Sequence, residues 1–142
     1  MKPRSATLLL LLLGFLIPAA AEPGEFLVVN INPQVRGVDH SIAWEQPLTK
    51  VTKPGVPVVV NIDAQGLAIR VTVTAFVRDQ EFFLVVQGDV KQTKENGTRG
   101  STTVQSLMVP QGESIAYFPL GRVVEGSGPQ MVVLIQVEFQ DE

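Results

Sequence analysis

The chain contains one group of adjacent residues with the chemistry of a hydrolase: Asp39, His40 and Ser41. A carboxylate, an imidazole and a hydroxyl activate a serine nucleophile, but only when the three side chains converge. Consecutive residues of an extended chain point to alternate faces, so these side chains diverge. His40 is the only histidine of the chain, so no other imidazole could act as the base for a serine nucleophile. We therefore interpret residues 39–41 as a polar loop.

The acidic residues form no recognisable catalytic motif. The chain has 14 Asp and Glu residues, and a glycosidase-like pair of carboxylates stays open as an arrangement that only folding would create. Sequence context places Asp63, Asp79 and Asp89 in turns. The absence of cysteine excludes disulfides, thiolate metal sites and thiol catalysis, and no calcium, phosphate or dinucleotide motif occurs. We expect no enzymatic activity, no metal and no cofactor.

The polar and basic side chains that could contact a partner are concentrated between residues 87 and 105. Lys91, Lys94 and Arg99 form a basic cluster, which would attract an acidic or polar partner; plain solubility explains the same charges without one. Gln and Thr side chains flank the cluster on strands that would either pair with another chain through backbone hydrogen bonds or form the solvent face of an ordinary sheet. A partner would meet Gln87, Lys91, Gln92, Lys94, Arg99, Thr103 and Gln105.

Strands must position these residues. Residues 67–78 alternate apolar and polar side chains with the period of two that is typical of a half-buried strand, and the short Asp79-Gln80 connection predicts a hairpin into residues 81–87. Further strands are predicted at residues 25–32, 41–46, 56–62, 101–109, 114–118 and 131–139, with a polar loop at 88–100 and an irregular crossover at 119–130. Seven to eight short strands without a helical stripe predict an all-β fold, an antiparallel immunoglobulin-like β-sandwich.

The first 21 residues have the three parts of a secretory signal peptide. Lys2 and Arg4 precede an apolar run at residues 6–17, Pro18 ends the run, and residues 19–21 are small. The run is too short to span a bilayer, although an uncleaved anchor is the alternative interpretation. Cleavage would leave one domain, residues 22–142, with no further apolar run of spanning length. It would also change the formal net charge from −3 to −5, which disfavours nucleic-acid binding. An exported domain without cysteine fits the bacterial periplasm, or the cell surface.

The C-terminal half resembles a known family. Residues 84–123 read LVVQGDVKQTKENGTRGSTTVQSLMVPQGESIAYFPLGRV, and residues 131–139 read MVVLIQVEF. This pattern is similar to that of the periplasmic curli-assembly proteins, small exported immunoglobulin-like sandwiches that restrain amyloid formation by the curlin subunit. The resemblance spans about half of the mature chain, which lacks the cysteines of some members and has a longer N-terminal half. The resembling positions are Gly97, Gly100, Ser101, Gln105, Pro110, Gly112, Leu120 and residues 133–137.

A second likeness, over residues 102–121, is to a strand-turn-strand near the end of outer-membrane secretins, although the chain is too short to build a secretin channel. The curli resemblance implies a monomeric binding module that acts as an assembly factor or inhibitor of an amyloid or fimbrial subunit. Amyloid growth requires an open strand edge that templates the next strand, and the segment from Gln87 to Gln105 would meet that edge. The alternative is a structural subunit, or an accessory of a surface fibre or outer-membrane secretion complex. In that case residues 25–32 or 131–139 would pair with a neighbouring subunit.

Overall fold

A computed structural model describes residues 25–64, 66–122 and 128–141 of the protein. These residues form strands and connecting turns, and no helix, as the alternating sequence pattern predicted. Accordingly, none of them belongs to a helix long and apolar enough to cross a membrane. The predicted signal peptide at residues 1–21 and its cleavage point lie outside the described residues.

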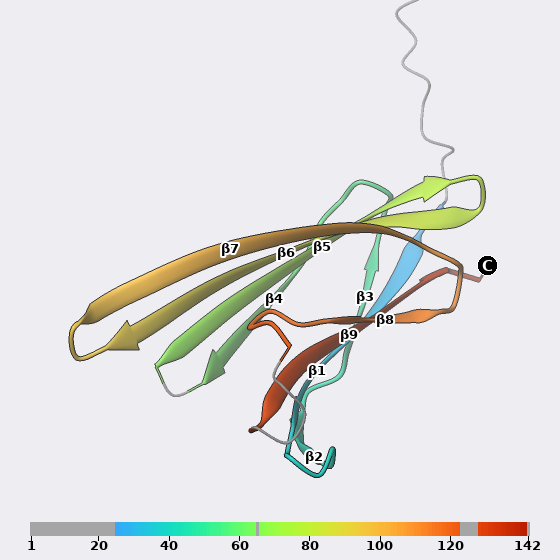
Figure 1. The fold of residues 1–142 in the computed structure, drawn as a ribbon. Helices are drawn as coiled ribbons and strands as arrows, with labels where there is room; N and C mark the ends of the chain where they lie inside the picture. Colours follow the sequence, from blue (N-terminus) through green and yellow to red (C-terminus); the bar gives the residue numbers. More distant parts are fainter. Residues whose placement is uncertain (1–24, 65, 123–127, 142) are drawn as a thin grey trace, which may run out of the picture.

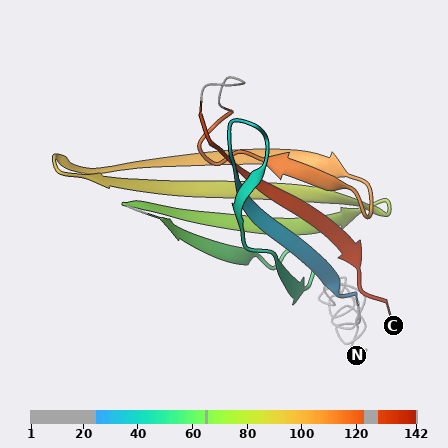
Figure 2. The ribbon, with the colours of Figure 1, turned by 90° about the horizontal axis from the view of Figure 1, so that it is seen from below.

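The strands form two antiparallel sheets that face each other (Figures 1 and 2). In the five-stranded sheet, β1 is central: it pairs with β9 on one side and with β2 and β3 on the other, and β8 completes the sheet beyond β9. The four-stranded sheet has the order β4-β5-β6-β7. The bounds are β1 Leu27–Arg36, β2 Ile42–Glu45, β3 Leu48–Thr52, β4 Val58–Ala64, β5 Leu67–Arg78, β6 Glu81–Lys94, β7 Gly97–Val109, β8 Ser114–Tyr117 and β9 Gln130–Phe139.

One apolar core lies between the sheets. Alternate residues of β1 and β9 point into it from the five-stranded sheet, and alternate residues of β4, β5 and β6 from the four-stranded sheet. In β5 the buried residues are those that the alternation placed on one face, Ile69, Val71, Val73 and Ala75. Fully burying a Val, Leu, Ile or Phe side chain stabilises the fold by about 1.5–3 kcal/mol. The burial of apolar side chains is therefore the main source of stability of this sandwich-like arrangement. We call the face of the four-stranded sheet that points away from the core its outer face.

The structure corrects the loop predicted at residues 88–100. β6 continues to Lys94 and β7 begins at Gly97, so that only Glu95 and Asn96 remain as the turn. Residues 91–100 are exposed whichever face they point to. A strand without a covered face carries no apolar alternation, which is why the sequence resembled a loop. Asp63 and Asp89 consequently lie in β4 and β6 and not in turns, whereas Asp79 does lie in the predicted β5–β6 hairpin turn.

Two smaller differences occur in the five-stranded sheet. β1 runs through Pro33, where a stop was expected, and the carbonyl of Pro33 accepts a hydrogen bond from the Gln46 amide at 3.1 Å. The short strand β3 was not predicted, because its two apolar residues, Leu48 and Val51, are three positions apart and show no alternation with a period of two. It pairs with the first half of β1, and it widens the sheet on the side opposite to β9.

Candidate functional site

The β6–β7 hairpin extends beyond the part of the molecule where the two sheets face each other (Figure 1). Its antiparallel register is continuous from Phe82 opposite Val109 to Lys94 opposite Gly97, without a bulge. Gly97 has a φ of 126°, a conformation that glycine adopts at low cost, and it allows the chain to reverse after the Glu95-Asn96 turn. The hairpin is therefore a regular arm of paired strands and not a flexible loop, and β5 flanks β6 as far as Gln92.

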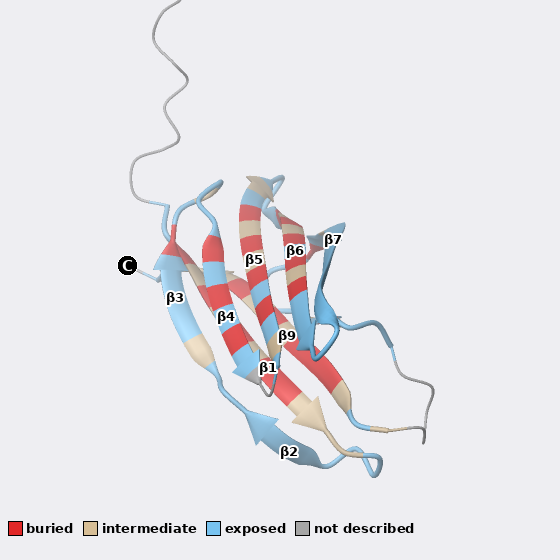
Figure 3. Ribbon diagram, turned by 90° about the vertical axis from the view of Figure 1, so that its left-hand side faces the viewer, coloured by how far each residue is buried: buried red, intermediate tan, exposed pale blue. Residues whose placement is uncertain are grey.

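β7 is the last strand in the order of the four-stranded sheet, so one of its edges pairs with no described strand. Residues 97–106 are exposed on both faces, and β7 has the pale blue of exposed residues in Figure 3. Natural sheets protect such edges with charges, prolines or bulges. β7 contains one charged residue, Arg99, and neither charge nor proline from Ser101 to Val109. The structure thus presents an edge of 13 residues, about 40 Å long, whose part from Ser101 to Val109 has no such protection.

The structure brings all seven sequence-predicted contact residues onto this hairpin, but divides them between its two faces. Gln87 and Lys91 are on the outer face, as are their β7 partners in the register. The other five lie on the opposite face, which toward Val109 turns into the core. These five are Gln92, Lys94, Arg99, Thr103 and Gln105. A partner that lies flat on one face would therefore miss part of the set, whereas one that pairs along the β7 edge would pass both groups.

Thr103 has a structural contact that the sequence did not reveal. Its hydroxyl is 2.7 Å from the hydroxyl of Tyr117 in β8, and Tyr117 is buried. The Tyr117 ring lies over Gly88, where a Cβ atom would overlap the Tyr117 hydroxyl oxygen and lie 3.1 Å from the ring carbon Cζ. Gly88 and Thr103 face each other in the register. This Tyr117 contact connects the arm to the five-stranded sheet.

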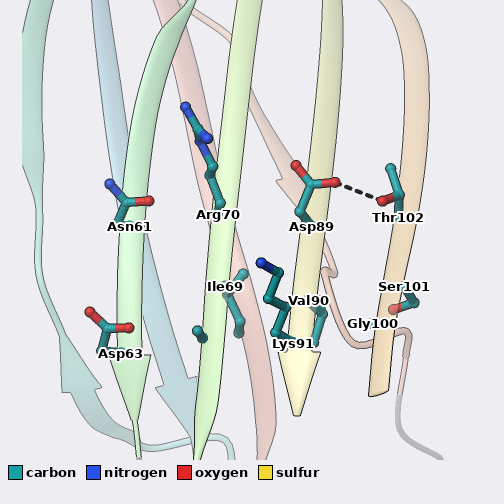
Figure 4. Close-up of a pocket in the computed structure, with 11 residues that line it drawn as sticks. Asn61, Asp63, Ile69, Arg70, Asp89, Val90, Lys91, Gly100, Ser101 and Thr102 are labelled. Atoms are coloured by element: carbon teal, nitrogen blue, oxygen red, sulfur yellow. Dashed lines mark hydrogen bonds between the residues drawn. The ribbon is translucent and has the colours of Figure 1, made fainter. Parts of the chain in front are cut away.

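A polar row crosses the outer face of the four-stranded sheet. In the register, Asn61 is opposite Arg70, Arg70 opposite Asp89, and Asp89 opposite Thr102. The Asp89 carboxylate accepts a hydrogen bond from the Thr102 hydroxyl at 2.7 Å, drawn in Figure 4, and one from the Gln87 amide at 3.2 Å. No sequence pattern indicated this row, because strand order alone decides which residues become neighbours.

The row forms one side of an open depression of about 480 Å³ toward the end of the arm (Figure 4). On its other side lie Asp63, Ala68, Lys91 and Gly100, of which the small Ala68 and Gly100 leave the space. Acidic and basic side chains alternate here, and the depression contains no histidine or aromatic residue. Nothing in this set resembles a nucleophile with its base, and the described residues contain no cluster of three or more His, Asp or Glu that could hold a metal ion.

Apolar side chains occupy the outer face nearer the base of the arm. Phe76, Phe83 and Met108 are opposite one another on β5, β6 and β7, and the two phenylalanine rings have centroids 6.3 Å apart. Phe76, Met108 and Val104 are exposed. Along the arm, the outer face of the sheet thus changes from apolar side chains near the base to charged side chains near the tip.

Asp39, His40 and Ser41 form a tight polar turn between β1 and β2. The Ser41 hydroxyl donates to the Asp39 carboxylate at 2.6 Å, and the Ser41 amide donates to the same oxygen at 3.2 Å. The hydrogen bond from the Ser41 hydroxyl is the main reason that the pKa of Asp39 lies below its usual value. Serine here binds the carboxylate directly, with no histidine between them as a relay would require, so the geometry agrees with the polar-loop interpretation.

No protein-family model, no curated protein and no solved structure matches this chain.

Proposed function

We propose that this protein is an exported, non-enzymatic binding module whose β7 edge pairs with an extended strand of another polypeptide. The observation that carries this proposal is the edge itself: 13 residues in unbroken register with β6, exposed on both faces between residues 97 and 106, and uncharged from Ser101 to Val109. Strand addition takes its affinity from backbone hydrogen bonds and requires little of the side chains. An edge with Ser, Thr and Gln side chains suits such a partner.

The partner that we propose is an amyloid or fimbrial subunit, and the protein is a curli-type assembly factor or inhibitor in the periplasm. A growing amyloid end is an open row of strand N–H and C=O groups, the chemical complement of the β7 edge. Pairing would occupy that end, while Lys91, Lys94 and Arg99 near the tip would oppose the addition of further strands, since charges at an edge discourage stacking. The immunoglobulin-like type of sandwich and the cleaved signal peptide belong to this same proposal.

The alternative is a structural subunit or an accessory of a surface fibre or secretion complex. For this alternative the sequence predicted residues 25–32 or 131–139 as the pairing strand. Both segments lie in interior strands, since β1 has neighbours on both sides and β9 lies between β1 and β8. A subunit of this kind would have to use edge strands instead, for example β7 of one copy beside β4 of the next. It would then assemble into open-ended polymers visible by electron microscopy.

The test is fibre growth of the host's own amyloid or fimbrial subunit in the presence of the purified protein, followed by thioflavin T fluorescence. Substoichiometric amounts are expected to lengthen the lag phase. Val104→Lys, which places a charge in the middle of the edge, should abolish the delay. The matched control is Val59→Lys on β4, because Val59 and Val104 lie in one cross-strand row at opposite edges of the sheet. Unchanged growth at an equimolar amount of wild-type protein would refute the proposal.

A further inference from the structure

We infer that, in the absence of another partner, two copies of this chain pair antiparallel through their β7 edges and form a two-fold symmetric dimer with one continuous eight-stranded sheet. The starting observation is that β7 has no protective charge, proline or bulge between Ser101 and Val109. An edge of this kind pairs with whatever strand is available, and a second copy is always available. A two-fold axis closes the pair, so assembly stops at two chains.

The charge distribution along the arm favours this arrangement. Near the tip, residues 91–100 contain Lys91, Lys94, Glu95 and Arg99, a formal charge of +2. At the base, the exposed residues Asp79, Glu81 and Glu113 outnumber Arg78, giving a formal charge of −2. Antiparallel pairing of two arms places each basic tip beside the acidic base of the other copy. A parallel pair would instead place like charges together at both ends.

A two-fold axis at Val104 gives complementary neighbours on the outer face. Val104 lies opposite its own copy, Thr102 opposite Ser106 of the second copy, and Gly100 opposite Met108 of the second copy. The two valines are exposed before pairing, so their contact removes apolar surface from water. A Cβ at Gly100 would meet nothing nearer than the Val90 carbonyl oxygen at 3.8 Å, so there is room for the Met108 side chain.

The opposite face is compatible with the same register. Thr103 lies opposite Gln105 and Ser101 opposite Leu107 of the second copy. Arg99, the one charged residue of β7, lies opposite Val109 of the second copy and within side-chain reach of the acidic base. No like charges face each other at any position of the pair. Two strands that meet only along their edges form a small interface, which places the dimer among weak and reversible complexes.

Dimerisation has a consequence for the proposed function, although the dimer does not depend on that function. The edge that would meet a fibre subunit is buried in the dimer, so pairing with that subunit requires dissociation. The dimer therefore protects an aggregation-prone edge at high concentration and releases it on dilution. Inhibition of fibre growth per molecule should be strongest where the monomer predominates.

Sedimentation velocity of the purified protein across the micromolar range tests the inference. We expect a reversible monomer–dimer equilibrium that weakens as sodium chloride is raised, because the tip and base charges are exposed and are screened by salt. Val104→Lys should shift the protein to monomer, and Val59→Lys, the same change on the β4 edge, should not. Circular dichroism establishes that both variants are folded, which the exposure of Val104 leads us to expect.

Cysteine trapping tests the register independently, since the chain has no cysteine of its own. Val104→Cys should form a disulfide-linked dimer on mild oxidation, because paired residues on neighbouring antiparallel strands have Cα atoms about 4.5–5.5 Å apart. Val59→Cys should stay monomeric under the same conditions. A wild-type monomer at every concentration, equal effects at Val104 and Val59, or open-ended polymers would each overturn the dimer. A dimer without effect on fibre growth would refute the proposed function alone, and a monomer that delays growth would refute the dimer alone.

Discussion

The contact between Gly88 and Tyr117 provides the most direct test of how the arm is held. Gly88→Ala would place a Cβ atom against the Tyr117 hydroxyl oxygen, 3.1 Å from Cζ and 3.3 Å from Cε1. Tyr117 is buried, so its ring has little freedom to move away. The variant must either displace the ring and break its 2.7 Å hydrogen bond to Thr103, or separate β6 from β8.

Overpacking of a core costs about 1–3 kcal/mol, and a lost hydrogen bond adds about 1 kcal/mol. We therefore expect Gly88→Ala to lower the free energy of unfolding by about 2–4 kcal/mol, a large part of the roughly 5–15 kcal/mol typical of a domain. In urea this corresponds to a decrease of roughly 1–2 M in the midpoint. The assay is equilibrium urea unfolding followed by fluorescence and circular dichroism.

Two further variants separate this contact from a general effect of alanine in a strand. Gly100→Ala, in the same arm, meets no atom nearer than 3.8 Å and should change stability by less than about 1 kcal/mol. Tyr117→Phe removes the oxygen that the new Cβ meets, so the double variant Gly88→Ala/Tyr117→Phe should be more stable than the sum of the single effects predicts. Strict additivity, or a Gly88→Ala variant as stable as the wild type, would refute the packing argument.

Two other changes test the turns. Gln80 has a φ of 65° in the β5–β6 turn, a conformation that costs a non-glycine residue about 1–2 kcal/mol. Gln80→Gly should therefore raise the free energy of unfolding by about 0.5–1 kcal/mol. The control Glu81→Gly, one residue later in the strand, should lower the free energy of unfolding by a similar amount. The pKa of Asp39, measured by NMR titration of its carboxyl carbon, should lie below 3.8 and rise in Ser41→Ala. Because the folded-state pKa is the lower one, the stability that this turn contributes is present above pH 3.8 and is lost as the pH falls through the folded-state pKa; a wild-type pKa at or above 3.8 would contradict the turn geometry.

The sequence by itself determined that the fold is all-β with antiparallel strands, and it located most of those strands. In β5, the alternation of Ile69, Val71 and Val73 with polar residues was sufficient, because one face of that strand is buried and the other is not. The Asp79-Gln80 hairpin was equally visible, since a two-residue connection between two strand patterns leaves few other geometries. The Asp39–His40–Ser41 group could be interpreted as a polar loop from local chemistry alone.

Only the tertiary structure decided what the region from residue 91 to residue 100 is. Its residues are polar because neither face is covered, and a strand that buries nothing carries no periodic signal. Its strand character comes from backbone pairing with its neighbours, β5 with β6 and β6 with β7, which depends on register across the sheet. The same holds for the open edge of β7, the Asn61–Arg70–Asp89–Thr102 row and the Gly88–Tyr117 contact. The row and the contact join residues that are distant along the chain, and the order of the strands alone makes these residues neighbours and leaves β7 at an edge.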